Sequence, residues 1–369
     1  MSRSSIVSLL SIASCIALVG ACGGGGQSNH DGSAAGDGGH AGTGGSSSGG
    51  GDASAGTDGG ASAGSGDASA GTDGGARDVP VDAVADGSSD TSADAGASDG
   101  GGDADGGTRA VTLHFKATVG TAAFACGTTY QNQGTTGVSV RPRDFRFYVQ
   151  SVRLISASGQ EVPLALDVRS PWQTADLALL DFEDGTADCV DGNADMNSTI
   201  TGTVPAGTYT GIVFSNGVPD ALNHADPLTL PAPLQAGAMT WGWLYGFKFV
   251  KAELGATAAP VGDAGAGLGL AHVGSIGCDN SADGGSPDFN APPTVVCSQA
   301  NRNEIRLTGA DPTVRSIVAD IGAIFAATDL SKDEQCHSEG DACPSMFWSL
   351  GLDFATGAQL PTQTVYHFE

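Results

Sequence analysis

The sequence predicts a mostly β protein: an antiparallel β-sandwich-like domain, stapled by disulfides, with one or two short helices, that follows a disordered linker. Three observations lead to this fold class. Residues 109–369 hold the aromatic residues and six cysteines. Short runs of alternating hydrophobicity in this part are separated by turn-forming sequences. Residues 23–108 contain no aromatic residue and consist largely of Gly, Ala, Ser, Thr and Asp.

Four segments have the pattern or composition of β-strands, and turn sequences such as "ASGQ", "VPAG" and "DPT" lie between them. In the first segment, Val111, Leu113, Phe115 and Ala117 share one face. The second segment shifts its alternation partway along, which predicts a β-bulge. The four segments are residues 110–119, 144–156, 207–219 and 303–309.

One segment, residues 314–330, has helical periodicity. Its apolar residues recur at the spacing of a single helix face. They are Ile317, Val318, Ile321, Ile324 and Phe325. We therefore predict a helix here.

The stretch "MTWGWLYGFKF", residues 239–249, is predicted as a fifth strand with an aromatic face. Such a face is usually part of the core. Two features favour another role for it. Gly242 and Gly246 leave the opposite face open to close approach of another backbone, and two buried indole N–H groups would both need acceptors. Alternation places on the aromatic face Met239, Trp241, Trp243, Tyr245, Phe247 and Phe249.

Residues 1–21 predict a secretory signal peptide that ends in a lipoprotein cleavage site. Its apolar run follows Arg3 and is too short to span a membrane. The sequence "LVGAC" resembles the lipobox of bacterial lipoproteins, in which the cysteine, here Cys22, is lipidated. In Gram-negative lipoproteins, an aspartate directly after the lipidated cysteine usually signals retention in the inner membrane. Gly23 stands at this position, which favours lipid anchoring in the outer membrane, with the domain periplasmic or surface-facing. The alternative is an ordinary cleaved signal with an incidental cysteine.

Residues 22–108 predict a lipidated cysteine followed by a disordered tether. The segment "GDASAGTDGGA" occurs twice, and fourteen aspartates accompany one arginine, Arg77. This composition buries too little apolar surface to offset the conformational entropy of the chain. The formal net charge of -26 for the whole chain argues against nucleic acid and anionic membrane surfaces as partners. The domain would then be held to the membrane only through its lipid anchor.

The six cysteines of residues 109–369 predict disulfides, because the chain is exported and their number is even. Six cysteines allow fifteen pairings. Two pairs are favoured because each brackets a short polar loop: Cys278 with Cys297, and Cys336 with Cys343. The two remaining cysteines, Cys126 and Cys189, then form the third pair. Because no Cys-x-x-Cys pair is present, a structural zinc site is disfavoured.

Hydrolase and nucleotide-binding functions lack their motifs in the predicted β domain, because HExxH, GxSxG, CxxCH and a phosphate-binding glycine loop are all missing from residues 109–369. His224 and His272 stand in loop-like contexts. Taken alone, each is typical of a surface or hydrogen-bonded histidine. Imidazole also suits copper, and disulfide-bonded cysteines leave no thiolate to compete for the metal.

A second candidate site is the acidic segment "DFEDGTADCVDGNADMN", residues 181–197. Carboxylates beside tight glycine turns suit calcium, which takes six to eight oxygen ligands. The spacing differs from that of the EF-hand loop, so a solvated acidic loop pinned by Cys189 is the favoured interpretation. The candidate calcium ligands are Asp188, Asp191, Asn193 and Asp195.

Residues 109–369 also contain a series of short motifs in order. They are "FACG", "DFRFYV", "LLDFEDG", "LNHAD", "WGWLYGFKF", "HVGSIGC" and "NRNEI", followed by the pair Cys336 and Cys343. Together these motifs resemble the MbnP-like family, also called the metallo-mystery pair four-Cys motif proteins. The resemblance covers the whole predicted β domain, residues 109–369, and excludes the linker.

The resemblance implies an exported, β-rich copper-binding protein that is not an enzyme. In that family a di-haem cytochrome c partner of the peroxidase type oxidises a tryptophan to kynurenine, and histidines bind copper together with the kynurenine. By motif position, His224 and His272 are the histidines, and either Trp241 or Trp243 is the tryptophan. His114 lies outside the family pattern and is a further candidate ligand.

The competing interpretation is a structural or adhesive surface module. In it, the acidic segment 181–197 binds calcium and the aromatic stretch is plain core. An enzyme with a redox copper centre has little support, because no substrate-binding constellation is visible in the sequence.

Overall fold

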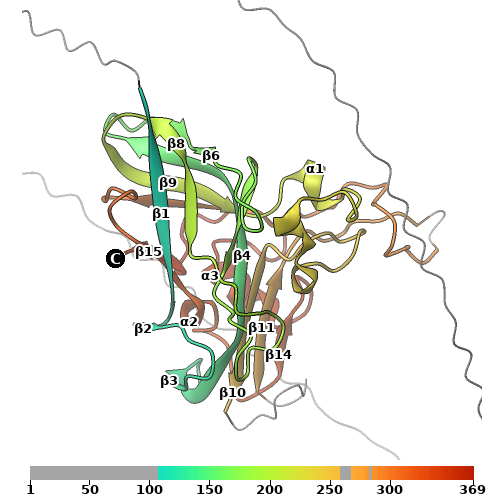
Figure 1. Cartoon of the computed structure of the whole chain (residues 1–369). Coiled ribbons are helices and arrows are strands. Elements are labelled where there is room, and N and C mark those ends of the chain that lie inside the picture. Colours follow the sequence, from blue (N-terminus) through green and yellow to red (C-terminus); the bar gives the residue numbers. More distant parts are fainter. Residues whose placement is uncertain (1–106, 258–266, 282–284) are drawn as a thin grey trace, which may run out of the picture. The chain divides into compact units, whose positions relative to one another are not determined.

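The computed structural model describes residues 107–257, 267–281 and 285–369 (Figure 1). The predicted signal peptide, the lipidation site Cys22 and the linker up to residue 106 lie outside these residues. Strand β1 (Thr108–Val119) begins the domain. In the described part of the chain, every helix is too short or too polar to cross a membrane.

Six strands form the first sheet, in the order β15-β13-β1-β8-β6, with β2 paired to β1. Strand β1 runs parallel to β13 and antiparallel to β2 and β8. The apolar residues predicted to share one face of β1 are buried, so the predicted alternation is confirmed. The other strands are β2 (Ala122–Ala123), β6 (Ala165–Leu166), β8 (Thr199–Pro205), β13 (Ile317–Asp320) and β15 (Tyr366–Phe368).

Nine strands form the second sheet, in the order β12-β9-β4-β10-β11-β14, with β3, β5 and β7 paired to β4. The long strand β4 (Val138–Ser156) contains the predicted bulge: Ser151 has a φ of 53°, and the register with β9 shifts between Gln150 and Arg153. Strands β11 and β14 run parallel. The other strands are β3 (Tyr130–Gln133), β5 (Glu161–Pro163), β7 (Leu177–Asp181), β9 (Tyr209–Asn216), β10 (Val250–Ala256), β11 (Leu268–Val273), β12 (Asn303–Thr308) and β14 (Glu334–Cys336).

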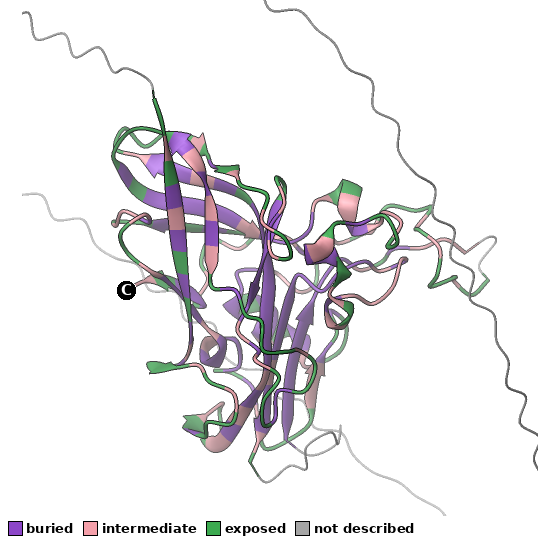
Figure 2. Ribbon diagram, viewed as in Figure 1, coloured by how far each residue is buried: buried purple, intermediate pink, exposed green. Residues whose placement is uncertain are grey.

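The two sheets enclose one hydrophobic core, seen as the buried faces in Figure 2. Phe115 of β1 contacts Phe147 of β4 and Phe214 of β9, with ring centroids 6.2 and 5.7 Å apart. Tyr366 of β15 packs against the same two rings, and its hydroxyl donates to Asn216 Oδ1 (3.0 Å). Each such aromatic pair contributes about 0.5 to 1.5 kcal/mol beyond area burial. The predicted β-sandwich-like class is confirmed, with two parallel strand pairs in addition to the antiparallel ones.

The helix predicted for residues 314–330 is wrong over most of its length. Residues Ile317–Asp320 form β13, and only Ile321–Ile324 form helix α2. Hydrogen bonding to β1 outweighs the helical pattern up to Asp320, whose carboxylate then caps α2 by accepting from Gly322 N (2.9 Å). The apolar residues of the pattern are all buried. Ile317, Ile321, Ile324 and Phe325 belong to the core, whereas Val318 points to the opposite face of β13.

The remaining helices in the described residues are also short. They are α1 (Asp220–Asn223), α3 (Cys343–Ser349) and the 3-10 segments η1 (Ala232–Gln235) and η2 (Gly237–Met239). Three α-helices therefore stand where one or two were predicted.

Three disulfides join the pairs that the sequence favours. They are Cys126 with Cys189, Cys278 with Cys297, and Cys336 with Cys343. The last disulfide joins the end of β14 to the start of α3. It therefore fixes the segment that follows β14.

The outer face of the nine-stranded sheet differs from the face that lines the core. Part of it carries a second apolar cluster that includes Tyr148 of β4 and Phe249. Farther along β4, β10 and β11 the outer face is polar and largely buried. The residues that alternate with the polar ones point to the core, and they are Phe145, Phe147, Val250, Ala252, Ala271 and Val273. The polar row consists of Asp144, Arg146, Lys251, Glu253 and His272.

Candidate metal site

The aromatic stretch 239–249 is a tight loop rather than the predicted strand. The Trp241 N–H donates to Gly246 O (3.0 Å) and the Gly246 N–H donates to Gly242 O (2.9 Å). Gly242 and Gly246 have φ values of 103° and 72°, a region that glycine enters without steric cost. The two glycines thus fold the segment back on itself. Phe247 is buried, whereas Trp241 and Trp243 are partly exposed.

Trp241, His272 and His337 lie together at one end of β11. The ring centroids of Trp241 and His272 are 6.4 Å apart, and those of His272 and His337 are 5.0 Å apart. Trp241 and His337 line a cavity of about 320 Å³, whose other walls are Tyr245, Ser275, Ile276, Phe289 and Glu339. One tryptophan and two imidazoles therefore converge beside an open, mostly aromatic cavity.

The parallel pairing of β11 and β14 brings the two histidines together. Ala271 pairs with Cys336, so the next residues along each strand, His272 and His337, lie side by side. Ser338 then fixes this end of the strand pair, because its hydroxyl donates to His272 O (3.0 Å) and accepts from Gly274 N (2.8 Å). His337 was not among the predicted ligands. Its position directly after Cys336, which belongs to the ordered series of motifs, was the signal in the sequence.

Gly274 makes room for the Trp241 ring. A Cβ atom at this position would lie 2.5 Å from Trp241 Cζ3 and 2.5 Å from Phe247 O. The six-membered ring of the indole therefore packs directly against the backbone that follows His272. A larger residue at position 274 would displace the indole or the strand end.

His272 has one ring nitrogen that is engaged and one that is not. Its Nε2 lies 2.7 Å from Glu253 Oε1. Its buried Nδ1 has no hydrogen-bond partner among the described residues. A buried polar atom without a partner is costly and uncommon, and it is an observation that a bound metal would explain.

Burial favours the neutral imidazole of His272. Burial lowers the pKa of His272 to about 4, although Glu253 opposes the shift. Burial acts to raise the pKa of Glu253, but the hydrogen bond from His272 and the charge of Lys251 bring it to about 2. An ionised carboxylate only accepts hydrogen bonds, so Nε2 carries the proton and Nδ1 carries a free lone pair. This is the form of histidine that binds metals.

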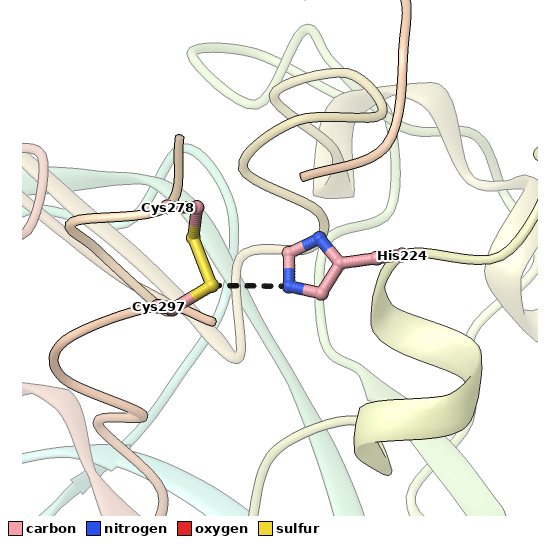
Figure 3. A group of neighbouring side chains, drawn as sticks. All are labelled: His224, Cys278 and Cys297. Carbon is pink, nitrogen blue, oxygen red and sulfur yellow. Dashed lines mark hydrogen bonds between the residues drawn. A yellow bond between two sulfur atoms is a disulfide. The ribbon is translucent and has the colours of Figure 1, made fainter. Parts of the chain in front are cut away.

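His224 and Trp243 form a second histidine and tryptophan pair, but their polar groups are used internally. The Trp243 indole N–H donates to His224 O (2.8 Å). His224 Nδ1 lies 3.3 Å from Trp243 O, and His224 Nε2 lies 2.9 Å from Asn223 Nδ2. His224 Nε2 is also 3.3 Å from Cys297 Sγ of the Cys278–Cys297 disulfide (Figure 3). These contacts join the end of α1 to the loop 239–249 and to the Cys278–Cys297 disulfide. The sulfur atoms, being bonded to one another, are not thiolate ligands.

His114, the further candidate ligand, lies apart from this group in the fold. It is exposed on β1 and pairs in register with Thr199 of β8, in the six-stranded sheet. His272 lies on β11 of the nine-stranded sheet. The structure therefore does not bring His114 to the cluster of Trp241, His272 and His337.

Three of the four candidate calcium ligands in the acidic segment 181–197 use their side chains in contacts within the protein. Asp188 pairs with Arg141 (3.4 Å), and Asp191 pairs with Lys251 Nζ (2.5 Å). Asn193 accepts from Asp195 N (2.7 Å). Asp144, Asp191 and Glu253 are close enough to hold a cation, but the Lys251 ammonium contacts all three carboxylates. The arrangement gives no support to calcium binding.

Comparisons with known proteins point to one family. A family model named MbnP matches residues 108–338. The solved structure of MbnP from Methylosinus trichosporium is similar, with 28% sequence identity and a TM-score of 0.58, over 70% of this chain and 98% of that chain. No protein with curated annotation matches the chain. The matched residues include the loop 239–249 and both histidines of the cluster.

Proposed function

This chain belongs to the MbnP family, and we propose that it is an exported protein that binds copper through His272, His337 and a kynurenine formed from Trp241. The observation that carries the proposal is the buried Nδ1 of His272, which has no hydrogen-bond partner among the described residues and lies in a neutral imidazole next to Trp241 and His337. The proposal leaves His224 and Trp243 with a structural role.

The donor set suits copper. Imidazole nitrogens are good copper ligands, and the aromatic walls of the cavity offer no hard oxygen-rich cage that would favour calcium or magnesium. The indole N–H of tryptophan is a donor only and does not bind metals. Oxidative cleavage of the C2–C3 bond opens the five-membered ring, and hydrolysis of the N–C2 bond then releases C2 as formate. The nitrogen is left as an aryl amine, which has a lone pair for the metal.

Oxidation of Trp241 needs an external oxidant, and we assign that part to a di-haem cytochrome c partner of the peroxidase type. Trp241 is partly exposed and lines the open cavity, so an oxidising partner has access to it. The chain itself is a binding protein in this proposal and has no catalytic role. The sequence "LVGAC" supports export as a lipoprotein anchored through Cys22 in the outer membrane.

The test compares two tryptophan variants of the full chain. Trp241→Phe and Trp243→Phe are each purified after production together with the di-haem partner, and copper per chain is measured by inductively coupled plasma mass spectrometry. We expect Trp241→Phe to lose its copper and Trp243→Phe to retain it, because only the first removes the kynurenine precursor.

The proposal fails if both variants retain the wild-type copper content, or if only Trp243→Phe loses it. Circular dichroism of both variants checks that the β fold is kept. Trp243→Phe is a matched control, because it removes an indole of the same loop whose N–H is bonded to His224 O.

A further inference from the structure

Glu253 is the hydrogen-bond partner of His272, and both side chains are held by rigid strands. Glu253 lies on β10 and His272 on β11, in adjacent antiparallel strands whose register pairs Glu253 with Leu270 and Lys251 with His272. Glu253 therefore reaches His272 diagonally across the outer face of the sheet, with 2.7 Å between Oε1 and Nε2. Only 13% of the Glu253 side chain and 6% of the His272 side chain are exposed.

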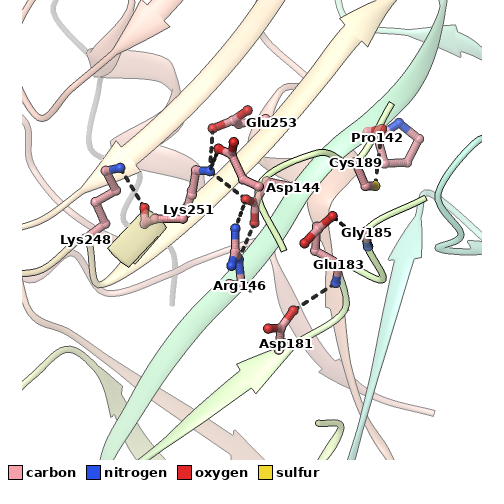
Figure 4. A network of polar contacts seen from close by, with 12 residues as sticks. Pro142, Asp144, Arg146, Asp181, Glu183, Gly185, Cys189, Lys248, Lys251 and Glu253 are labelled. Carbon is pink, nitrogen blue, oxygen red and sulfur yellow. Dashed lines mark hydrogen bonds and ion pairs between the residues drawn. The ribbon is translucent and has the colours of Figure 1, made fainter. Parts of the chain in front are cut away.

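The Glu253 carboxylate is itself held by a buried ion network (Figure 4). Lys251 Nζ lies 3.3 Å from Glu253 Oε1, 2.6 Å from Asp144 Oδ2 and 2.5 Å from Asp191 Oδ2. Asp144 in turn forms a two-point ion pair with Arg146. Within the buried row, the cations Arg146 and Lys251 balance the carboxylates Asp144 and Glu253, and the half-exposed Asp191 adds a third carboxylate at Lys251. The charge of Glu253 is thus satisfied without consuming its bond to His272.

We propose that Glu253 is the positioning residue of the copper site, and that it fixes His272 as the Nε2–H tautomer so that Nδ1 is the nitrogen that binds the metal. The proposal rests on the proposed function. A carboxylate only accepts hydrogen bonds, so it selects the tautomer that carries its proton on Nε2. Carboxylate partners of metal-binding histidines act in this way, by fixing both the tautomer and the ring orientation.

The network explains why Glu253 is suited to this role. Its carboxylate cannot turn away from His272 without losing the contact with Lys251, which in turn is held by Asp144 and Asp191. Asp191 belongs to the acidic segment 181–197, so this segment contributes to the copper site through Lys251 rather than as a calcium site.

The first test is a tautomer measurement on the metal-free, unoxidised full chain, which does not depend on copper. Nitrogen-15 NMR distinguishes a protonated ring nitrogen from an unprotonated one. We expect His272 in the wild-type protein to show a single tautomer with its proton on Nε2. A proton on Nδ1 in the wild-type protein overturns the proposal, whether or not any variant folds.

The second test uses Glu253→Gln. The amide of glutamine offers a donor as well as an acceptor, so selection of one tautomer is lost. We expect Glu253→Gln to populate both tautomers and, after production with the di-haem partner, to bind copper(I) about 10- to 100-fold more weakly in competition with a chelator. Glu253→Asp keeps the charge and should lie closer to wild type. Glu304→Gln is the control, since Glu304 pairs with Arg153 away from this row and should leave both readouts unchanged.

The outcomes separate the two proposals. If His272→Ala retains copper, the proposed function is wrong. If His272→Ala loses copper while Glu253→Gln keeps the wild-type tautomer and affinity, the site is right and the role of Glu253 is wrong.

Discussion

Two histidine and tryptophan pairs in this protein have similar sequence contexts and opposite hydrogen-bonding states. In the pair of His224 and Trp243, both imidazole nitrogens and the indole N–H have partners within the protein. In the pair of His272 and Trp241, the buried Nδ1 of the histidine has none among the described residues. His224 follows a four-residue helix, whereas His272 lies within β11, a strand that is paired on both sides.

The comparison teaches that residue type and motif do not by themselves identify a metal ligand. A histidine whose nitrogens are both engaged stabilises the fold, and using it as a ligand would break those bonds at a cost of about 1 kcal/mol each. A histidine held by one nitrogen on rigid strands offers its second nitrogen without rearrangement. The following predictions test this difference between the two pairs.

The largest difference is expected from replacing each histidine in turn. His272→Ala should abolish copper retention, because it removes the nitrogen that is free to bind. His224→Ala should retain copper and lower the free energy of unfolding by about 1 to 2 kcal/mol, since it removes the hydrogen bonds of the imidazole to Asn223 and Trp243. Copper content of the protein produced with its partner and denaturant unfolding measure the two effects. Loss of copper from His224→Ala alone would reverse the assignment of the two pairs.

An intermediate effect is expected from Gly274→Ala, which changes the backbone position against which the Trp241 ring packs. The added Cβ would overlap the indole and the backbone of Phe247, so we expect the free energy of unfolding to fall by about 1 to 3 kcal/mol, together with a weaker hold on copper. Gly207→Ala is a matched control, because its Cβ would meet no atom within 4 Å. Equal stability and copper content in the two variants would show that the indole is not held where we place it.

The smallest effect is the pH dependence of stability in the metal-free protein. His272 has a pKa of about 4 when folded, against a usual value of 6.5, so the unfolded chain binds a proton first as the pH falls. The free energy of unfolding should therefore decrease by about 2 kcal/mol between pH 7 and pH 5 on account of this group. This contribution is present above pH 6.5 and is lost as the pH falls toward 4.

Urea unfolding at several pH values measures this contribution. His272→Gln should remove this part of the slope, whereas His224→Gln should leave it in place. An unchanged slope in His272→Gln would mean that His272 is not buried as a neutral imidazole.

Much of the fold could be predicted from the sequence because strand alternation is local. The buried face of β1 and the bulge in β4 follow from spacing alone. The helix over residues 314–330 could not be predicted correctly, because parallel pairing with β1, about 200 residues earlier in the chain, decides the conformation of Ile317–Asp320. The same limit applies to the loop 239–249, where glycines in the left-handed region override the alternation of apolar residues.

Only part of the candidate site could be predicted from the sequence. Trp241 and His272 were predicted by motif, but their separation from Trp243 and His224 depends on which polar atoms find partners, which only the folded structure decides. His337 was missed because its closeness to His272 arises from the parallel register of β11 and β14. Glu253 was missed because the polar row on the outer face becomes apparent only when three strands are aligned.

The most direct test of the central claim is tandem mass spectrometry of the native protein, isolated from cells that also produce its di-haem partner. The peptide that spans residues 239–249 contains both tryptophans, and fragment ions locate an oxidised residue at one of them. The account predicts kynurenine at Trp241 and an intact indole at Trp243. Kynurenine at Trp243, or two intact indoles in protein that nevertheless carries copper, would contradict it.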